Sequence, residues 1–227
     1  MIDRQRRGLA LTLAMAFALI GSRGLAYGAG SGTSLSTLAA FDAAFAKVDD
    51  YTVTMTAHEV AGSDVQDRVY HYWFKKPHQA KIEIVSGAGA GGGGVWTGTD
   101  QVRGHQGGLL SHFHLKVDLH DRRAVSLRGY TIPDGLFANE VDKYRQIKGE
   151  LAQHDGPVID GDATEAVELR LAEPAANAGV TRMVLDLSKK THMPVRQTRY
   201  AGDQIVTTEN WTDLKTNTGL TSADFPF

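Results

Sequence analysis

The sequence predicts a mainly β protein in which one antiparallel sheet folds over two helices. Apolar and polar residues alternate with a period of two in many short segments between residues 51 and 214, which is typical of half-buried strands. Short turns rich in Gly, Asp or Pro separate these segments, as expected for neighbouring antiparallel strands. Only two segments show a helical spacing. A broad sheet therefore has to be covered by few helices.

Residues 1–30 have the pattern of a secretory signal peptide. Arginines form a basic start, and residues 8–20 follow as an uncharged apolar run of 13 residues before a stretch of small residues. This run is shorter than the roughly 20 residues that cross a bilayer as a helix. We therefore expect residues 1–30 to be cleaved and residues 31–227 to form a single domain in the periplasm.

Composition narrows the function of the mature chain. Residues 1–30 contain four Arg and one Asp, a net charge of +3, so their removal takes the formal charge from −2 to −5. An acidic chain is not expected to bind nucleic acid. The absence of Cys excludes disulfides, thiol nucleophiles, thiolate metal ligands and a lipid on an amino-terminal Cys. We expect a soluble monomer that is stabilised by an ordinary hydrophobic core.

The first helix is predicted over residues 34–48, where Leu38, Phe41, Phe45 and Val48 recur at spacings of three, four and three. Side chains at these spacings lie on one face of a helix. This face is expected to contact the sheet.

Strands follow the first helix along most of the chain. In the first strand, Tyr51, Val53 and Met55 alternate with threonines and mark the inward face. Residues 87–94 contain only Gly and Ala and are predicted to form a flexible loop at a hairpin tip. A second helix is predicted over residues 135–153. The predicted strands are residues 51–58, 65–75, 81–85, 95–96, 101–105, 167–171, 183–187, 195–200 and 204–214.

Few residues suggest catalysis or metal binding. His112 and His114 fall on one side of a strand, with His105 and His120 nearby, so a Zn²⁺ or Cu²⁺ site is one hypothesis. No further ligand spacing supports it. The chain lacks a Gly-x-Ser-x-Gly nucleophile motif, and its paired carboxylates lie in turn-like segments. We therefore expect no enzyme, no catalytic residues, no metal and no cofactor.

The apolar face of the strands has two interpretations. Such a face usually forms the core of an ordinary fold. A sheet this broad can also curve around its helices and leave a cavity that admits a hydrophobic ligand. The residue pattern leaves both interpretations open.

Three segments together resemble the LolA/LolB-like superfamily of periplasmic outer-membrane lipoprotein carrier and sorting proteins. The first is Tyr-Trp-Phe-Lys-Lys-Pro at residues 72–77, followed by Lys-Ile-Glu at 81–83. The second is Gly-Val-Trp-Thr-Gly-Thr-Asp-Gln-Val at 94–102. The third is Met-Pro-Val-Arg at 193–196, which leads to Glu-Asn-Trp-Thr-Asp-Leu-Lys-Thr-Asn at 209–217. Residues 87–94 and 119–130 differ from the classical lipoprotein chaperone, so the chain looks more like a divergent branch.

The resemblance implies a half-open antiparallel β-barrel, a curved sheet wrapped around lid helices. It also implies a periplasmic carrier that binds lipid or lipoprotein acyl chains in a hydrophobic cavity for transfer across the cell envelope. Its protein partners would be an inner-membrane donor and an outer-membrane acceptor. The alternative is an envelope sensor or adaptor of the same fold that binds a lipidic signal and a protein partner.

The side chains expected to line the cavity are apolar and lie on the first helix or on the inward face of a strand. They are Leu38, Phe41, Phe45, Tyr51, Val53, Met55, Trp73, Ile82, Ile84, Trp96, Met183 and Leu185.

Overall fold

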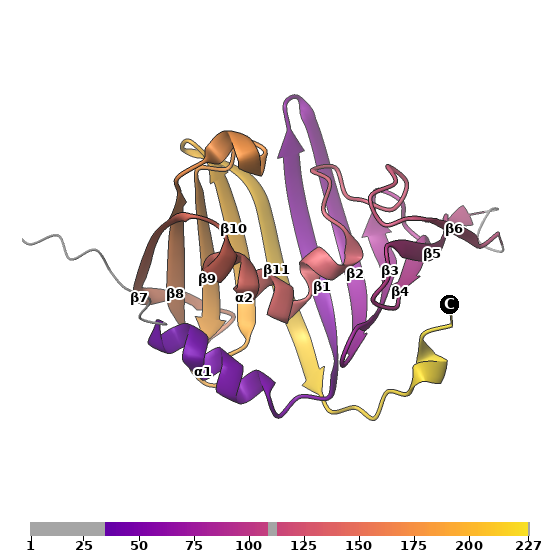
Figure 1. Cartoon of the computed structure of the whole chain (residues 1–227), viewed down its shortest axis with the longest axis horizontal. Helices are drawn as coiled ribbons and strands as arrows, with labels where there is room; N and C mark the ends of the chain where they lie inside the picture. Colours follow the sequence, from indigo (N-terminus) through magenta and orange to yellow (C-terminus); the bar gives the residue numbers. More distant parts are fainter. Residues whose placement is uncertain (1–34, 109–112, 227) are drawn as a thin grey trace, which may run out of the picture. The chain divides into compact units, whose positions relative to one another are not determined.

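An eleven-stranded antiparallel sheet forms the body of the protein (Figure 1). The computed structural model describes residues 35–108 and 113–226, so the expected signal peptide lies outside the described residues. The order across the sheet is β6-β5-β4-β3-β2-β1-β11-β10-β9-β8-β7, which leaves the sheet open, and the predicted mainly β, curved-sheet fold is confirmed. The strands are β1 (Asp50–Ala61), β2 (Asp64–Lys75), β3 (Gln79–Gly87), β4 (Gly93–Trp96), β5 (Gln101–His105), β6 (Leu115–Asp118), β7 (Gly149–Ile159), β8 (Asp162–Leu171), β9 (Arg182–Ser188), β10 (Pro194–Ala201) and β11 (Gln204–Thr216).

Two consecutive meanders, β1–β6 and β7–β11, make up this sheet. They are joined by the pairing of β1 with β11, in which Met55 lies opposite Trp211. Because β6 and β7 are the two opposite edges, the chain between them has to cross the concave face (Figure 1). This crossing segment, residues 119–148, contains the 3₁₀ helix η2 (Ile132–Gly135) and the helix α2 (Phe137–Gln146). Two further 3₁₀ turns are η3 (Pro174–Asn177) and η4 (Ser222–Asp224).

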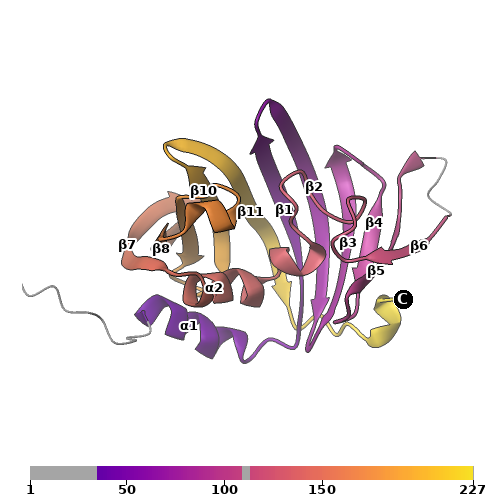
Figure 2. The same cartoon turned by 45° about the horizontal axis from the view of Figure 1, so that its top comes forward.

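The helices α1 (Ser36–Phe45) and α2 lie side by side across the β7–β11 half of the sheet (Figures 1 and 2). An ion pair of 2.7 Å between Asp42 and Arg145 connects them. The helix predicted over residues 34–48 is thus confirmed, with an end three residues earlier. In the part of the chain that the structure describes, neither helix is long and apolar enough to span a membrane.

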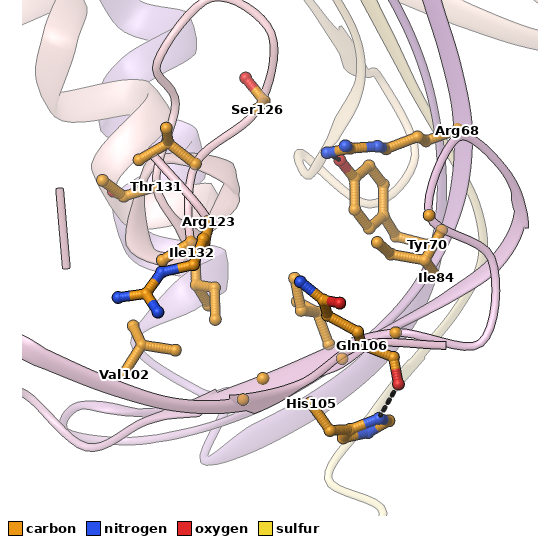
Figure 3. A pocket seen from close by; sticks show the side chains of 18 of the residues that line it. Arg68, Tyr70, Ile84, Val102, His105, Gln106, Arg123, Ser126, Thr131 and Ile132 are labelled. Carbon is orange, nitrogen blue, oxygen red and sulfur yellow. Dashed lines mark hydrogen bonds between the residues drawn. The ribbon is translucent and has the colours of Figure 1, made fainter. Parts of the chain in front are cut away.

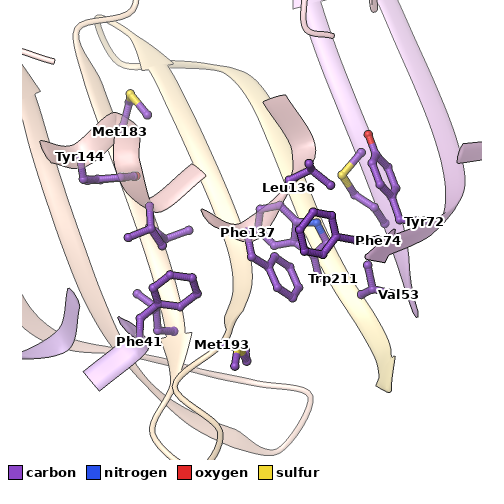
Figure 4. Packing of buried hydrophobic residues seen from close by; sticks show 14 of the residues in the cluster. Phe41, Val53, Tyr72, Phe74, Leu136, Phe137, Tyr144, Met183, Met193 and Trp211 are labelled. Atoms are coloured by element: carbon purple, nitrogen blue, oxygen red, sulfur yellow. The ribbon is translucent and has the colours of Figure 1, made fainter. Parts of the chain in front are cut away.

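Buried side chains fill the space between the two helices and the sheet (Figure 4). The Tyr51 ring of β1 stacks on Phe137 of α2, with centroids 4.7 Å apart. Trp211 meets Phe137 edge to face at 5.7 Å. The Tyr144 hydroxyl donates to the Gln197 side chain at 2.9 Å, so its polar atom is paired within the core. This half of the concave face is therefore a packed core.

The second helix is shorter than the sequence pattern predicts. It ends at Gln146, and residues 149–153 of the predicted helix belong to the edge strand β7. Gly149 pairs with Leu171 of β8, and a Cβ there would lie 2.2 Å from the Arg170 carbonyl oxygen. Leu151 is 41% exposed in this strand, so it does not belong to a buried helical face. Pairing with β8 gives the backbone of β7 its hydrogen-bond partners, and this overrides the weak helical spacing.

The chain after β11 is fastened to the start of β1. The buried carboxylate of Asp50 accepts hydrogen bonds from the backbone N–H groups of residues 218–220 and from the Thr218 hydroxyl. Burial opposes ionisation of Asp50, but these hydrogen bonds outweigh it and hold the pKa below its ordinary value. The Asn217 side chain accepts from the Asp49 backbone at 2.8 Å. The end of the carboxyl-terminal motif therefore has a structural role.

Candidate ligand-binding site

A cavity of about 760 Å³ lies between the β1–β6 half of the sheet and the crossing segment (Figure 3). No residue of α1 or α2 lines this cavity. Its cover, called the roof below, comes from residues 123–126, 130–132 and Gly135 of the crossing segment. This irregular segment is narrower than a pair of helices and leaves space beneath it. The volume falls within the roughly 300–1,000 Å³ of pockets that hold small molecules.

Apolar side chains form most of the lining. Among them Met55, Tyr72, Val102 and Ile132 are at most 5% exposed, so they lie deep in the wall. Phe113 is 67% exposed and marks the rim. The apolar and aromatic side chains of the lining are Met55, Tyr70, Tyr72, Ile82, Ile84, Ala90, Val102, Phe113, Leu115, Val117, Ala124, Val125, Tyr130 and Ile132.

Glycines of the β3–β4 turn and of β4 form part of the cavity wall. A Cβ at Gly94 would lie 3.1 Å from the side chains of both Ile132 and Val102, so a side chain there would intrude on the roof contact. A Cβ at Gly93 would lie 2.6 Å from the Ile82 carbonyl oxygen. The predicted hairpin at residues 87–94 is confirmed, but Gly93 and Gly94 already belong to β4 because they pair with β3. The tract lines the cavity in addition to forming a turn.

The roof is anchored to β1 through a buried carboxylate. Glu59 is 3% exposed and accepts hydrogen bonds from the Ser126 hydroxyl at 2.8 Å and the Arg128 backbone at 2.7 Å. The Arg128 guanidinium donates to the Val60 and Ala178 carbonyl oxygens at 2.7 and 2.9 Å. These contacts tie the roof to both meanders, which fixes the height of the cavity.

A buried group of charges lies between the cavity and the packed core. The Arg199 guanidinium contacts Glu140 of α2 at 2.7 Å and Glu209 of β11 at 3.0 Å. Lys143 adds a second cation, 2.8 Å from Glu140. Glu209 is also part of the cavity wall. Burial raises the pKa of Glu209 to about 7, although Arg199 opposes the shift.

Two arginines contribute to the cavity wall. Arg123 binds Asp121 through both carboxylate oxygens, at 2.9 and 2.7 Å. Arg68 donates instead to two neutral oxygens, the Ala88 carbonyl at 2.7 Å and the Tyr70 hydroxyl at 3.1 Å. Among residues 35–108 and 113–226, no carboxylate lies within ion-pair distance of Arg68.

The structure brings three of the twelve predicted residues, Met55, Ile82 and Ile84, into the cavity wall. Met183 lines a smaller hollow of about 290 Å³, which shares Tyr130 with the cavity. The other predicted residues except Trp73 line neither hollow. They belong to the packed core, which also includes Met55 and Met183, or lie against it, as Ile82 and Ile84 do: Leu38, Phe41, Phe45, Tyr51, Val53, Trp96 and Leu185.

Trp73 lies on the opposite face of β2 from the cavity. Its neighbours Tyr72 and Phe74 are buried on the inner side, and the Lys81 ammonium lies 4.6 Å from the Trp73 ring centroid on the outer side. The register of the β1–β2 hairpin explains this placement. A two-residue turn pairs Ala61 with Asp64, so the odd-numbered inward residues of β1 face even-numbered residues of β2.

The same register would have identified two of the residues that the sequence analysis missed, Arg68 and Tyr70. They lie opposite Ala57 and Met55 of β1, respectively, on the inward face. The roof residues carry no comparable signal, because residues 119–131 have neither a strand nor a helix period.

The histidine hypothesis is tested only in part, since His112 lies outside the described residues. The rings of His105 and His114 are 5.1 Å apart, edge to face. Within the described portion of the chain, no three His, Asp or Glu side chains converge as metal ligands.

Comparison with known proteins finds solved structures of similar fold. No family model and no curated protein matches the chain. An uncharacterized conserved protein from Thermus thermophilus is similar with a TM-score of 0.54 and 11% identity, over 84% of this chain and 90% of that one. MucB is similar with a TM-score of 0.50 and 11% identity, over 86% of this chain and 64% of MucB.

A LolA superfamily protein from Nitrosomonas europaea is also among the similar structures, with a TM-score of 0.44 and 14% identity, over 87% of this chain and 99% of that one. The solved structures that resemble this chain thus include a LolA superfamily protein. At identities this low, the likeness concerns the fold alone.

Proposed function

We propose that this protein is a periplasmic carrier that binds the acyl chain of a lipid or lipoprotein in the cavity and transfers it across the cell envelope. The observation that carries the proposal is the apolar lining of the 760 Å³ cavity. In a filled core, side chains such as Met55 and Ile132 would contact one another. Here Ile82 and Ile84 are only partly buried by neighbouring side chains and border a space that no side chain of the described residues fills.

The energetics of such a cavity suit a carrier. Each buried CH₂ group contributes about 0.8 kcal/mol, so about ten groups would contribute about 8 kcal/mol before the costs of ordering are subtracted. A gain of this size corresponds at most to roughly micromolar affinity. Moderate affinity permits release, which a carrier needs at its destination.

The test is to extract lipid from the purified protein, identify it by mass spectrometry and measure the binding of a fluorescent fatty-acyl probe. Ile84→Trp should weaken probe binding, since Ile84 lines the cavity and a larger ring would occupy its space. Val85→Trp is the matched control, because the neighbouring Val85 is 57% exposed and lies outside the cavity wall. Absence of both extracted lipid and probe binding in the wild-type protein would exclude carriage.

A second candidate is an envelope adaptor that binds a protein partner. It is favoured by the free edge strand β6, whose backbone has a strand neighbour on one side only within the described sheet, and by Leu115 of that strand, which is 56% exposed. Affinity capture from an envelope extract should then return a stoichiometric protein that Leu115→Ser releases. Capture of lipid without protein would contradict this candidate.

A further inference from the structure

We propose that Arg68 and the hydroxyl of Tyr70 bind the anionic head group of a single-chain amphiphile whose tail occupies the cavity. The head group is an oxyanion, either a carboxylate or a phosphate. This inference rests on the proposed function, because it names the class of ligand for the same cavity.

The first observation is the unpaired charge of Arg68 among the described residues. Its side chain lies in the wall of a mainly apolar cavity and is partly buried, yet its two protein partners are neutral oxygens. The Ala88 carbonyl and the Tyr70 hydroxyl orient the guanidinium without neutralising it. Figure 3 shows the guanidinium of Arg68 beside the Tyr70 hydroxyl. A guanidinium offers five N–H donors and binds planar oxyanions through two of them. Donors therefore remain for a ligand.

The second observation is the hydroxyl proton of Tyr70. Tyr70 is 5% exposed, and its oxygen accepts from Arg68. Within the described residues its own O–H donates to no acceptor. A buried donor without a partner costs about 1–3 kcal/mol, so an acceptor supplied by a ligand would relieve this cost. Burial also raises the pKa of Tyr70, which keeps the hydroxyl in its donating form.

The carboxylates of the same cavity do not compete for Arg68. Glu59 already accepts from Ser126 and from the Arg128 backbone. Glu209 is held by Arg199 at 3.0 Å. Of the two arginines in the wall, Arg123 is occupied by Asp121. Arg68 is thus the cation of the described wall that an anionic ligand can reach without breaking an ion pair.

The position of Arg68 fits the polarity of an amphiphile. It adjoins the exposed glycine loop, since a Cβ at Gly89 would lie 4.0 Å from the Arg68 guanidinium. Further along the inward face of β2 lie Tyr70 and then Tyr72, whose ring is in the deep wall. Arg68 and Tyr72 are four residues apart, roughly 13 Å along a strand. A head group at Arg68 can therefore direct its tail toward Tyr72 and Ile132.

The experiment compares palmitate, hexadecyl phosphate and hexadecanol, which share a chain length, as competitors of a fluorescent acyl probe. Arg68→Met should weaken the binding of the anion that is the true head group by roughly tenfold to a hundredfold, as expected for loss of a charged hydrogen bond. Hexadecanol binding should be unchanged, which shows that the cavity of the variant is intact. Tyr70→Phe should weaken the binding of the same anion by roughly threefold to tenfold.

Arg103→Met is the matched control, because it removes the same charge from β5 at a residue outside the cavity wall. A loss for palmitate alone identifies a carboxylate, and a loss for hexadecyl phosphate alone identifies a phosphate. If Arg68→Met and Arg103→Met bind both anions equally well, the head-group site is refuted while acyl carriage stands. If the wild-type protein binds none of the three compounds, the proposed function itself fails.

Discussion

Arg199 of β10 contacts both carboxylate oxygens of Glu140 of α2, at 2.7 and 2.8 Å, and at most 3% of either side chain is exposed. This ion pair fastens α2 to the concave face of the sheet. Arg199 also contacts Glu209, which lines the cavity. The pair thus lies at the boundary between the packed half of the concave face and the hollow half.

Removing one partner of this pair should destabilise the fold strongly. Glu140→Gln is expected to lower the free energy of unfolding by about 3–5 kcal/mol, because it leaves the buried Arg199 charge with less compensation. Urea unfolding measures the difference. Asp42→Asn is the matched control, since Asp42 of α1 pairs with Arg145 of α2 at the surface. Exposed pairs contribute about 1 kcal/mol or less. Equal losses in the two variants would contradict the special role of the buried pair.

The stability of the protein should depend on pH through Glu209. Burial raises its pKa from 4.5 to about 7 in the folded state, against the attraction of Arg199. Its favourable contribution is therefore complete below pH 4.5 and is lost as pH rises through about 7. Glu209→Gln, which stays neutral, should flatten this part of the profile in unfolding measurements across that range. Glu83→Gln, an exposed control on β3, should leave the slope unchanged; an unchanged slope in Glu209→Gln would contradict the assignment.

Acid should weaken the hydrogen bonds that residues 218–220 donate to Asp50 at the start of β1. The pKa of Asp50 is held below its ordinary value of 3.8, because hydrogen bonds from residues 218–220 outweigh the effect of burial. The contribution of Asp50 is therefore present above pH 3.8 and is lost as pH falls through the lower folded value. Asp50→Asn should cost about 1–3 kcal/mol at neutral pH. Amide hydrogen exchange at residues 218–220 should accelerate in Asp50→Asn and stay slow in the exposed control Asp49→Asn.

Affinity should rise with the length of the acyl chain. Each CH₂ group that enters the cavity contributes about 0.8 kcal/mol, which corresponds to about a fourfold gain in affinity. A series of saturated fatty acids should follow this slope and then reach a plateau when the chain outgrows the cavity. Calorimetric titration measures the series. Affinity that does not change with chain length would show that the apolar wall does not hold the chain.

Local periodicity determined much of the fold in advance. The alternation at Tyr51, Val53 and Met55 places all three side chains inward, as observed, because the two faces of a strand follow directly from its period of two. The predicted second helix extends too far, because Ile147 and Leu151 continue a helical spacing. Only the pairing of β7 with β8 decides that this stretch is a strand.

The candidate site was less accessible from the sequence than the fold. Met55, Ile82 and Ile84 were placed in its wall by strand parity alone. Leu38 and Leu185 have the same apolar character and inward direction, yet they lie in the packed core and outside the cavity wall. The pattern of residues does not distinguish the two groups, because both consist of apolar side chains directed toward the interior.

The sequence by itself determined an antiparallel sheet with an apolar inner face and, through its first thirty residues, the expectation of export. The tertiary structure decided where that inner face is filled and where it is hollow. The difference arises because α1 and α2 pack on the filled part of the face, whereas only the irregular roof covers the cavity beside β1–β6. A cavity is the space left between segments that are distant along the chain. Residue patterns are local, so they fix the direction of each side chain but not what lies opposite it.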